Sequence, residues 1–170
     1  MSMKVYLFTL FAAATLVMSG GAALAEQAPG HAEGHQHSSA ANEVSAHADV
    51  KKHQACPHCG MDREKFSHSR MLITYADGYS VGTCSLHCAA TELKAAKGKA
   101  VKAVEVADLN TKKLIDAEKA TWVIGGSRKG VMTRVPKWAF ASKDAAAGFI
   151  KKNGGALATY KEALAQAEKE

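Results

Sequence analysis

Residues 56–61 read Cys-Pro-His-Cys-Gly-Met and residues 84–88 read Cys-Ser-Leu-His-Cys, and these two motifs hold every cysteine of the chain. The first motif is a C-x-x-C pair closed by Gly60. It is typical of a tight metal-binding turn, because glycine readily adopts positive φ where the turn ends. In a helix, the spacing of the second motif places Cys84 and Cys88 one turn apart on the same face. Two such pairs that meet supply up to four thiolates to one soft cation, Zn2+ or Cu(I).

The same motifs are compatible with two other chemistries. An oxidising compartment permits two structural disulfides, and four cysteines allow three pairings. Cys-Pro-His-Cys is also the active-site sequence of exported thiol–disulfide oxidoreductases, in which the first thiol has a strongly lowered pKa. That active site follows a buried strand and opens a long helix, whereas here a polar segment precedes Cys56 and Gly60 follows Cys59. The context therefore favours a metal site, and we expect no enzymatic activity.

Further sulfur and imidazole groups lie within or beside the cysteine motifs. Met61 directly follows Gly60, and thioether sulfur is a preferred ligand of Cu(I). Met132 lies in a glycine-flanked loop from which a side chain can reach across to a site, and His87 stands inside the second motif. Four thiolates alone suit structural zinc equally well, so the sequence does not decide between Zn2+ and Cu(I). The candidate metal ligands are Cys56, Cys59, Met61, Cys84, Cys88, Met132 and His87.

The first 25 residues have the features of a secretory signal peptide. Lys4 provides the positive start, residues 5–17 form a short apolar run, and residues 23–25 read Ala-Leu-Ala, a small-x-small cleavage site. We expect cleavage after Ala25 and a periplasmic protein without a membrane anchor, because no cysteine lies near the cut for lipidation. The formal net charge of +6 comes from scattered Lys and Arg, so we expect no nucleic-acid partner.

Residues 26–54 are rich in Ala, His, Ser, Glu and Gly and contain almost no large apolar side chains. Such a segment buries too little apolar surface to offset its ordering entropy, so we predict a disordered, His-rich leader. Its imidazoles either bind metal ions weakly or belong to a plain polar linker. The histidines of the predicted leader are His31, His35, His37, His47 and His53.

A hairpin and a helix are predicted to follow the first cysteine motif. Two β-prone runs flank Asp77–Gly78, which is the strongest short signal for a β-hairpin. A helix comes next, with Thr83 or Ser85 as its N-cap and Gly98 as its stop. The order of metal-binding turn, hairpin and helix is that of treble-clef metal domains. We therefore predict a first, treble-clef-like unit over residues 55–99.

Residues 100–170 predict a second unit of strands and helices. Ser142 is a candidate N-cap for a helix that ends at Gly154–Gly155, and Thr159 with Glu162 forms a capping-box pattern for a last helix. Together with the first unit, these patterns give an α+β fold class. The strand candidates of the second unit are residues 101–106 and 120–124.

Nine short stretches, in order along the folded part, match one known family. They are Cys59–Met61, Tyr75–Gly78, Gly82–Cys84, Ile115–Ala117, Trp122–Ile124, Gly130–Thr133, Trp138–Phe140, Ala145–Phe149 and Gly154–Gly155. Over about residues 56–164 the chain resembles the NosL family of exported copper-binding accessory proteins, which serve assembly of the copper centre of nitrous oxide reductase. The resemblance implies two small ββαβ-type units, similar in fold to organomercury lyase.

The resemblance also implies particular site residues. Cys59 and Met61 match the family's Cys-Gly-Met, and Met132 matches the methionine of its later Gly-x-Met-like stretch. Family members commonly carry a lipid-anchored cysteine and fewer cysteines overall, whereas this chain has no such anchor and two complete pairs. We interpret the chain as a Cu(I) chaperone that delivers copper to an apo-enzyme such as nitrous oxide reductase or to another copper chaperone. A structural zinc-binding interaction module is the alternative.

Overall fold

The computed structural model describes residues 47–170. The predicted signal peptide and most of the predicted leader lie outside these residues. No helix in the described part is long and apolar enough to cross a membrane. The helices are α2 (Ala48–Lys52), α3 (Leu86–Ala95), α4 (Lys143–Asn153) and α5 (Tyr160–Ala167). The strands are β1 (Met71–Tyr75), β2 (Ser80–Thr83), β3 (Val101–Ala107), β4 (Leu114–Asp116), β5 (Thr121–Ile124), β6 (Lys137–Phe140) and β7 (Ala156–Ala158).

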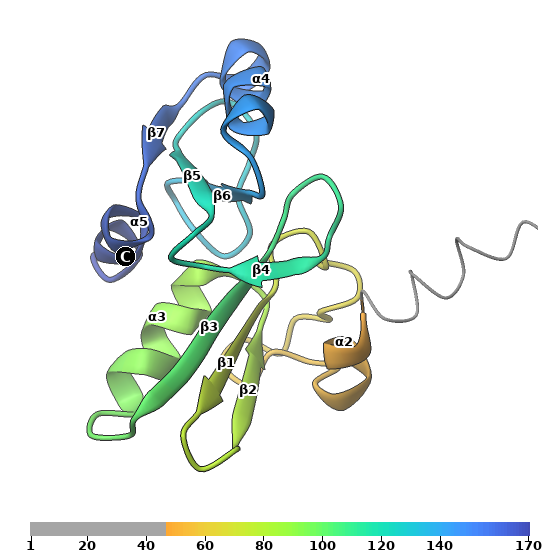
Figure 1. Ribbon diagram of the computed structural model, residues 1–170, viewed down its shortest axis with the longest axis vertical. Coiled ribbons are helices and arrows are strands. Elements are labelled where there is room, and N and C mark those ends of the chain that lie inside the picture. The colour runs from red at the N-terminus through yellow and green to blue at the C-terminus, as the bar shows by residue number, and fades with distance from the viewer. Residues whose placement is uncertain (1–46) are drawn as a thin grey trace, which may run out of the picture. The chain divides into compact units, whose positions relative to one another are not determined.

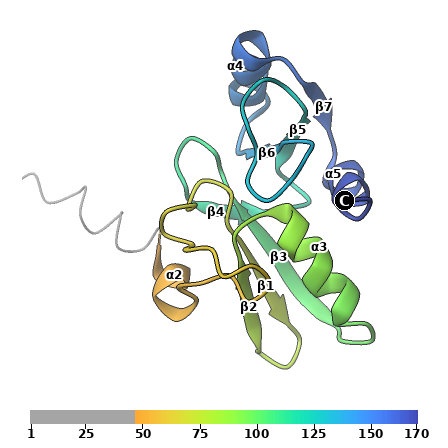
Figure 2. The same cartoon turned by 180° about the vertical axis from the view of Figure 1, so that it is seen from behind.

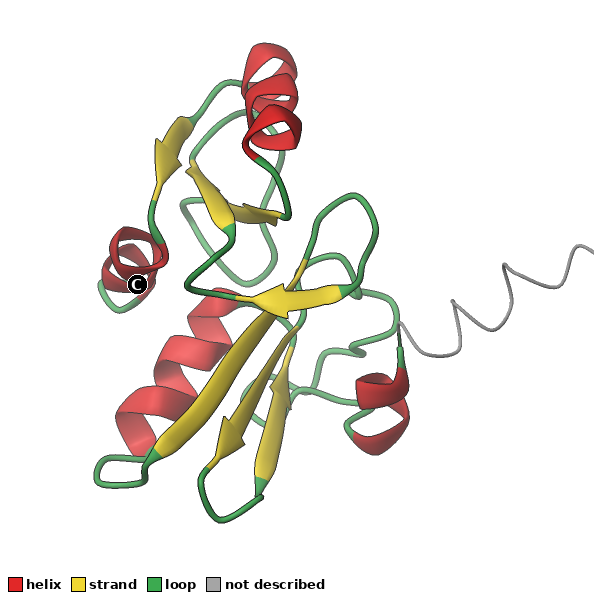
Figure 3. Ribbon diagram, viewed as in Figure 1, coloured by secondary structure: helices red, strands yellow, loops and turns green. Residues whose placement is uncertain are grey.

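The strands form two small antiparallel sheets, shown in yellow in Figure 3. The first sheet has the order β2-β1-β3-β4 and the second has the order β6-β5-β7. Each sheet contains a ββαβ unit, β1-β2-α3-β3 in the first and β5-β6-α4-β7 in the second, with the first strand of the unit in the middle (Figure 1). The predicted α+β fold with two ββαβ-type units is therefore confirmed. The third strand of the first unit, β3, begins after residue 99, where the predicted first unit ends.

The predicted hairpin is present between β1 and β2. Thr74 pairs with Ser80, and Gly78 has φ +85°, a conformation that glycine adopts without steric cost. Strand β1 alternates buried and half-buried residues, as expected for a strand with one face on the core. The hairpin brings the chain back so that Cys84 follows β2 directly.

Both predicted helix starts in the second unit are confirmed. Ser142 Oγ accepts a hydrogen bond from the backbone N–H of Ala145, and Thr159 with Glu162 forms a complete capping box. Strands β4 and β7 were not predicted, because three residues are too few for a period-two pattern. Each is defined by the neighbouring strand with which it pairs, β3 for β4 and β5 for β7.

One hydrophobic core joins the two units. It contains Ile73 of β1, Ala89 of α3, Trp122 of β5 and Ala163 of α5, all of them almost completely buried. A smaller cluster lies beneath α4 and includes Phe149. Because the first unit packs against elements of the second, the position of α3 does not depend on the first sheet alone.

The prediction of a disordered leader over residues 26–54 is wrong at the C-terminal end of that segment. Residues 48–52 form α2, and its Asp49 side chain lies between two fully buried arginines, Arg63 and Arg70. Asp49 Oδ2 accepts a hydrogen bond of 2.6 Å from Arg63 Nη2, and Asp49 Oδ1 accepts one of 3.0 Å from Arg70 Nη2. A polar segment is ordered here because its carboxylate neutralises two buried cations, a long-range pairing that composition does not reveal.

Arg63 links three further segments through backbone carbonyls. Its Nη1 donates to His53 O, its Nη2 to Met71 O and its Nε to Thr83 O, the residue before Cys84. Gly82 makes room for this guanidinium, because a Cβ there would lie 2.4 Å from Arg63 Cζ. The ion cluster of Asp49, Arg63 and Arg70 therefore fixes the end of β2 against the segment that leads to the first cysteine motif.

We expect Asp49→Ala to lower the free energy of unfolding by about 3–5 kcal/mol, because it leaves two buried guanidinium groups without their carboxylate. Burial raises the pKa of Asp49, but the hydrogen bonds and charges of Arg70 and Arg63 outweigh it and hold the pKa below its usual range. The contribution of a carboxylate with a lowered pKa is present above its unfolded-state pKa. The difference in free energy of unfolding between Asp49→Ala and the parent should therefore shrink only below about pH 4.

Urea denaturation followed by circular dichroism measures both effects. The matched control is Glu64→Ala, whose exposed carboxylate pairs with His47 and should change the free energy of unfolding by less than about 1 kcal/mol. Equal effects of the two substitutions would contradict the role given to the ion cluster.

Candidate metal centre

The first cysteine motif forms a tight turn closed by two backbone hydrogen bonds. The backbone N–H of Cys56 donates to Met61 O at 2.9 Å, and the backbone N–H of Gly60 donates to Cys56 O at 2.8 Å. Gly60 has φ +74°, the conformation for which the sequence pattern requires glycine. Ala55 and Asp62 pair as an isolated antiparallel bridge at the base of the turn. The turn therefore has the predicted shape.

The second motif spans the junction between β2 and α3. Cys84 follows the last residue of β2, and Cys88 lies in the first turn of α3. Ser85 is the N-cap, as predicted, although its side chain makes no capping hydrogen bond. Ser69 Oγ donates to Cys84 O at 2.8 Å and holds this junction against the segment after the turn. The observed order of turn, hairpin and helix is the predicted one.

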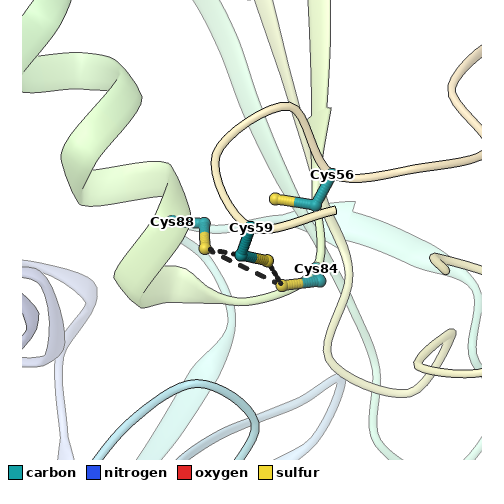
Figure 4. Close-up of side chains that lie close together, drawn as sticks. All are labelled: Cys56, Cys59, Cys84 and Cys88. Atoms are coloured by element: carbon teal, nitrogen blue, oxygen red, sulfur yellow. Dashed lines mark hydrogen bonds between the residues drawn. The ribbon is translucent and has the colours of Figure 1, made fainter. Parts of the chain in front are cut away.

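The four cysteine sulfur atoms converge (Figure 4). All lie within 4.8 Å of one another, and the Sγ–Sγ distances are 3.4 Å from Cys59 to Cys84, 3.7 Å from Cys59 to Cys88 and 3.8 Å from Cys84 to Cys88. Sulfur ligands at 2.3 Å around a tetrahedral ion are about 3.8 Å apart. The cysteines are free thiols in this structure. They form the one group of three or more His, Cys, Asp or Glu side chains among residues 47–170 that could hold a metal ion.

The burial of the four thiols is unequal. Cys56, Cys84 and Cys88 are at most 2% exposed, whereas Cys59 is half-buried. Phe66 and Met61 pack beside them, and Val131 closes the cluster from a loop of the second unit. An ion bound here is therefore reached from the side of Cys59.

Hydrogen bonds among the thiols shift their pKa values in opposite directions. Hydrogen bonds from Cys84 and Cys88 lower the pKa of Cys56, against the effect of burial. The bond to Cys56 raises the pKa of Cys84, and it raises the pKa of Cys88 to about 12. A cation binds the four sulfurs as thiolates, so its binding releases the protons that the thiols carry.

The structure places the other predicted ligands at different positions. Met61 is half-buried and packs against the cysteines. His87 is outside the group of converging sulfurs, and its Nδ1 is buried without a hydrogen-bond partner in the described part of the chain. Met132 is 43% exposed and has φ +49°, and its neighbour Val131 packs against the cysteines. Four of the seven predicted ligands converge, one lies beside them, and two do not join the sulfur group.

Sequence reasoning missed a link between the turn and the helix. His58 Nε2 hydrogen-bonds to Glu92 Oε2 of α3 at 2.8 Å, and Tyr75 Oη donates to Glu92 Oε1 at 2.8 Å. Burial raises the pKa of Tyr75 to about 12, so its hydroxyl remains a donor. The available signal was that Glu92 lies one helical turn after Cys88 on the same face of α3.

Known proteins are similar to this chain in sequence and in fold. The NosL family matches residues 47–167, which include α2 and both cysteine motifs. No curated protein matches the chain. The solved structure of the copper chaperone NosL from Shewanella denitrificans is similar to it, with a TM-score of 0.52 and 25% sequence identity. The match covers 64% of this chain and 87% of that chain.

These matches confirm the predicted resemblance and the predicted class, which is a binding protein rather than an enzyme. They do not support the alternative interpretation as a thiol–disulfide oxidoreductase. The family match over residues 47–167 covers the cysteine turn, both ββαβ units and the loop that carries Val131. The chain belongs to the NosL family.

Proposed function

We propose that this protein carries Cu(I) in the periplasm and passes it to a copper-dependent apo-enzyme, such as nitrous oxide reductase, or to another copper chaperone. The observation that carries the proposal is the convergence of four cysteine sulfurs within 4.8 Å. Thiolates are the ligands that a soft monovalent ion prefers. The similar solved structure is that of a copper chaperone, which adds support for copper.

Unequal burial gives the ion one route of exchange. Cys56, Cys84 and Cys88 keep it away from water, while Cys59 is half-buried and accessible to an incoming ligand. A thiolate or thioether of the receiving protein enters beside Cys59 and replaces the carrier's sulfurs one at a time. Met61, which packs against the cysteines, supplies a neutral sulfur ligand during this exchange. Met132, exposed in the loop next to Val131, is proposed as a further such ligand.

The second candidate function is a structural zinc-binding interaction module. Its support is that the Sγ–Sγ distances among Cys59, Cys84 and Cys88, 3.4–3.8 Å, equal those of a four-sulfur zinc site to within a few tenths of an ångström, and that Cys56 Sγ lies within 4.8 Å of all three. Such a site stabilises the fold and releases no cargo. The two proposals therefore differ in whether the ion can be exchanged and in whether the fold depends on it.

We expect the protein, purified under anaerobic and reducing conditions, to bind one Cu(I) per chain in competition with a chromophoric Cu(I) chelator. The double variant Cys84→Ser/Cys88→Ser should bind Cu(I) at least 100-fold more weakly, since loss of even a supporting residue of a metal site costs about 10–100-fold. The matched control is Thr91→Ser, on the exposed side of the same helix, which should bind as the parent does. One equivalent of zinc that excess Cu(I) does not displace would contradict the proposal and favour the zinc module.

We also expect the metal-free protein to remain folded, because the ion cluster of Asp49, Arg63 and Arg70 and the shared core position both cysteine motifs. After removal of metal under reducing conditions, far-ultraviolet circular dichroism should be unchanged and thermal unfolding should stay cooperative. If the ion is a structural staple, its binding energy is folding energy, and both the metal-free protein and the Cys84→Ser/Cys88→Ser variant should unfold.

A further inference from the structure

The loop between β5 and β6, residues 125–136, is strongly basic. It contains Arg128, Lys129 and Arg134 and no Asp or Glu. All three cations are exposed, and within residues 47–170 none of them takes part in an ion pair. We refer to residues 125–136 as the basic loop.

The basic loop reaches the sulfur cluster. Val131, at its centre, is 9% exposed and belongs to the same buried cluster as Cys56, Cys84 and Cys88. Figure 2 shows the loop extending from the second sheet towards the start of α3, where Cys88 lies. Met132, the next residue, is exposed and adopts a left-handed backbone conformation that methionine rarely takes. The basic loop thus contributes a buried side chain to the sulfur cluster and carries its exposed cations within three residues of Val131 on either side.

The shape of the basic loop is fixed at its C-terminal end by Glu170. The Glu170 carboxylate accepts hydrogen bonds from the backbone N–H of Val135 at 3.0 Å, from Lys137 Nζ at 3.1 Å and from Thr133 Oγ1. Its negative charge is matched by Lys137, whose side chain is 2% exposed. The three exposed cations of the loop therefore remain uncompensated.

Two cations, one in the basic loop and one beside the cysteines, lie over aromatic rings. The guanidinium of Arg128 lies 4.8 Å from the ring centre of Trp138, a cation–π contact that fixes its direction. Lys65 Nζ lies 5.9 Å from the ring centre of Phe66, which itself packs against the cysteines. Lys65 therefore adds a positive charge close to the sulfur cluster.

The positive charge of the basic loop does not attract free Cu(I), which is itself a cation. It suits a larger and negatively charged body. Exposed charges contribute little to the stability of a fold, but they steer a complementary surface and speed its encounter. We propose that the basic loop, through Arg128, Lys129 and Arg134, docks an acidic surface of the protein that receives the copper. This inference rests on the proposed function and names the chemistry of the partner.

The test uses two synthetic acceptor peptides with the same Cys-x-x-Cys copper site, one flanked by four Glu and the other by four Lys. Transfer of copper from the loaded full-length protein is followed by rapid mixing at low salt. We expect transfer to the Glu-flanked peptide to be about tenfold faster or more, and the difference to disappear at 1 M salt. The triple variant Arg128→Glu/Lys129→Glu/Arg134→Glu should reverse the preference.

The matched control is Lys143→Glu/Lys151→Glu/Lys152→Glu, which makes the same change of net charge on exposed positions of α4. It should keep the parent's preference. Equal rates for the two peptides, or equal effects of the two triple variants, would overturn the docking inference while copper binding stands. A lower equilibrium affinity for Cu(I) in the loop variant without a change in preference would also overturn it, because the loop would then act on the thiolates. Failure of the parent to load copper would instead overturn the proposed function.

Discussion

The buried ion cluster of Asp49, Arg63 and Arg70 is the constraint on which the rest of this structure depends. Arg63 is fully buried, so each of its N–H groups must find a partner, and they bind carbonyls on three segments as well as Asp49. One of these carbonyls belongs to Thr83, immediately before Cys84. The guanidinium thereby holds the end of the hairpin to the segment that leads into Cys56, and the two cysteine pairs meet as a consequence.

A site that is assembled by protein contacts has a different use from one assembled by its ion. Four neutral or singly ionised thiols can lie together at small electrostatic cost, whereas four thiolates repel one another until a cation arrives. The fold holds them close through the ion cluster, the shared core and the contact of Glu92 with His58. On the proposed function the binding energy of the ion is not needed for folding, which is the condition under which an ion can be cargo.

Local sequence signals predicted much of this fold. The Asp77–Gly78 turn, the Ser142 cap and the Thr159–Glu162 capping box act over a few residues, and each was correct. The convergence of the two cysteine pairs was also predicted, because a hairpin must return the chain to its start. Helix α2 was missed, since Asp49 meets its arginines 14 and 21 residues away and nothing in a polar segment signals such a pairing. The positions of His87 and Met132 depend on packing between units, which sequence spacing does not encode.

The central claim is that all four sulfurs surround one exchangeable Cu(I) ion. Copper K-edge X-ray absorption of the singly loaded protein tests it most directly, because the spectrum reports the elements in the first shell around the metal. The account predicts a shell of sulfur alone, with an edge characteristic of Cu(I), that is lost when Cys84 and Cys88 are replaced. A first shell dominated by nitrogen or oxygen, or a spectrum unchanged by these replacements, would contradict it.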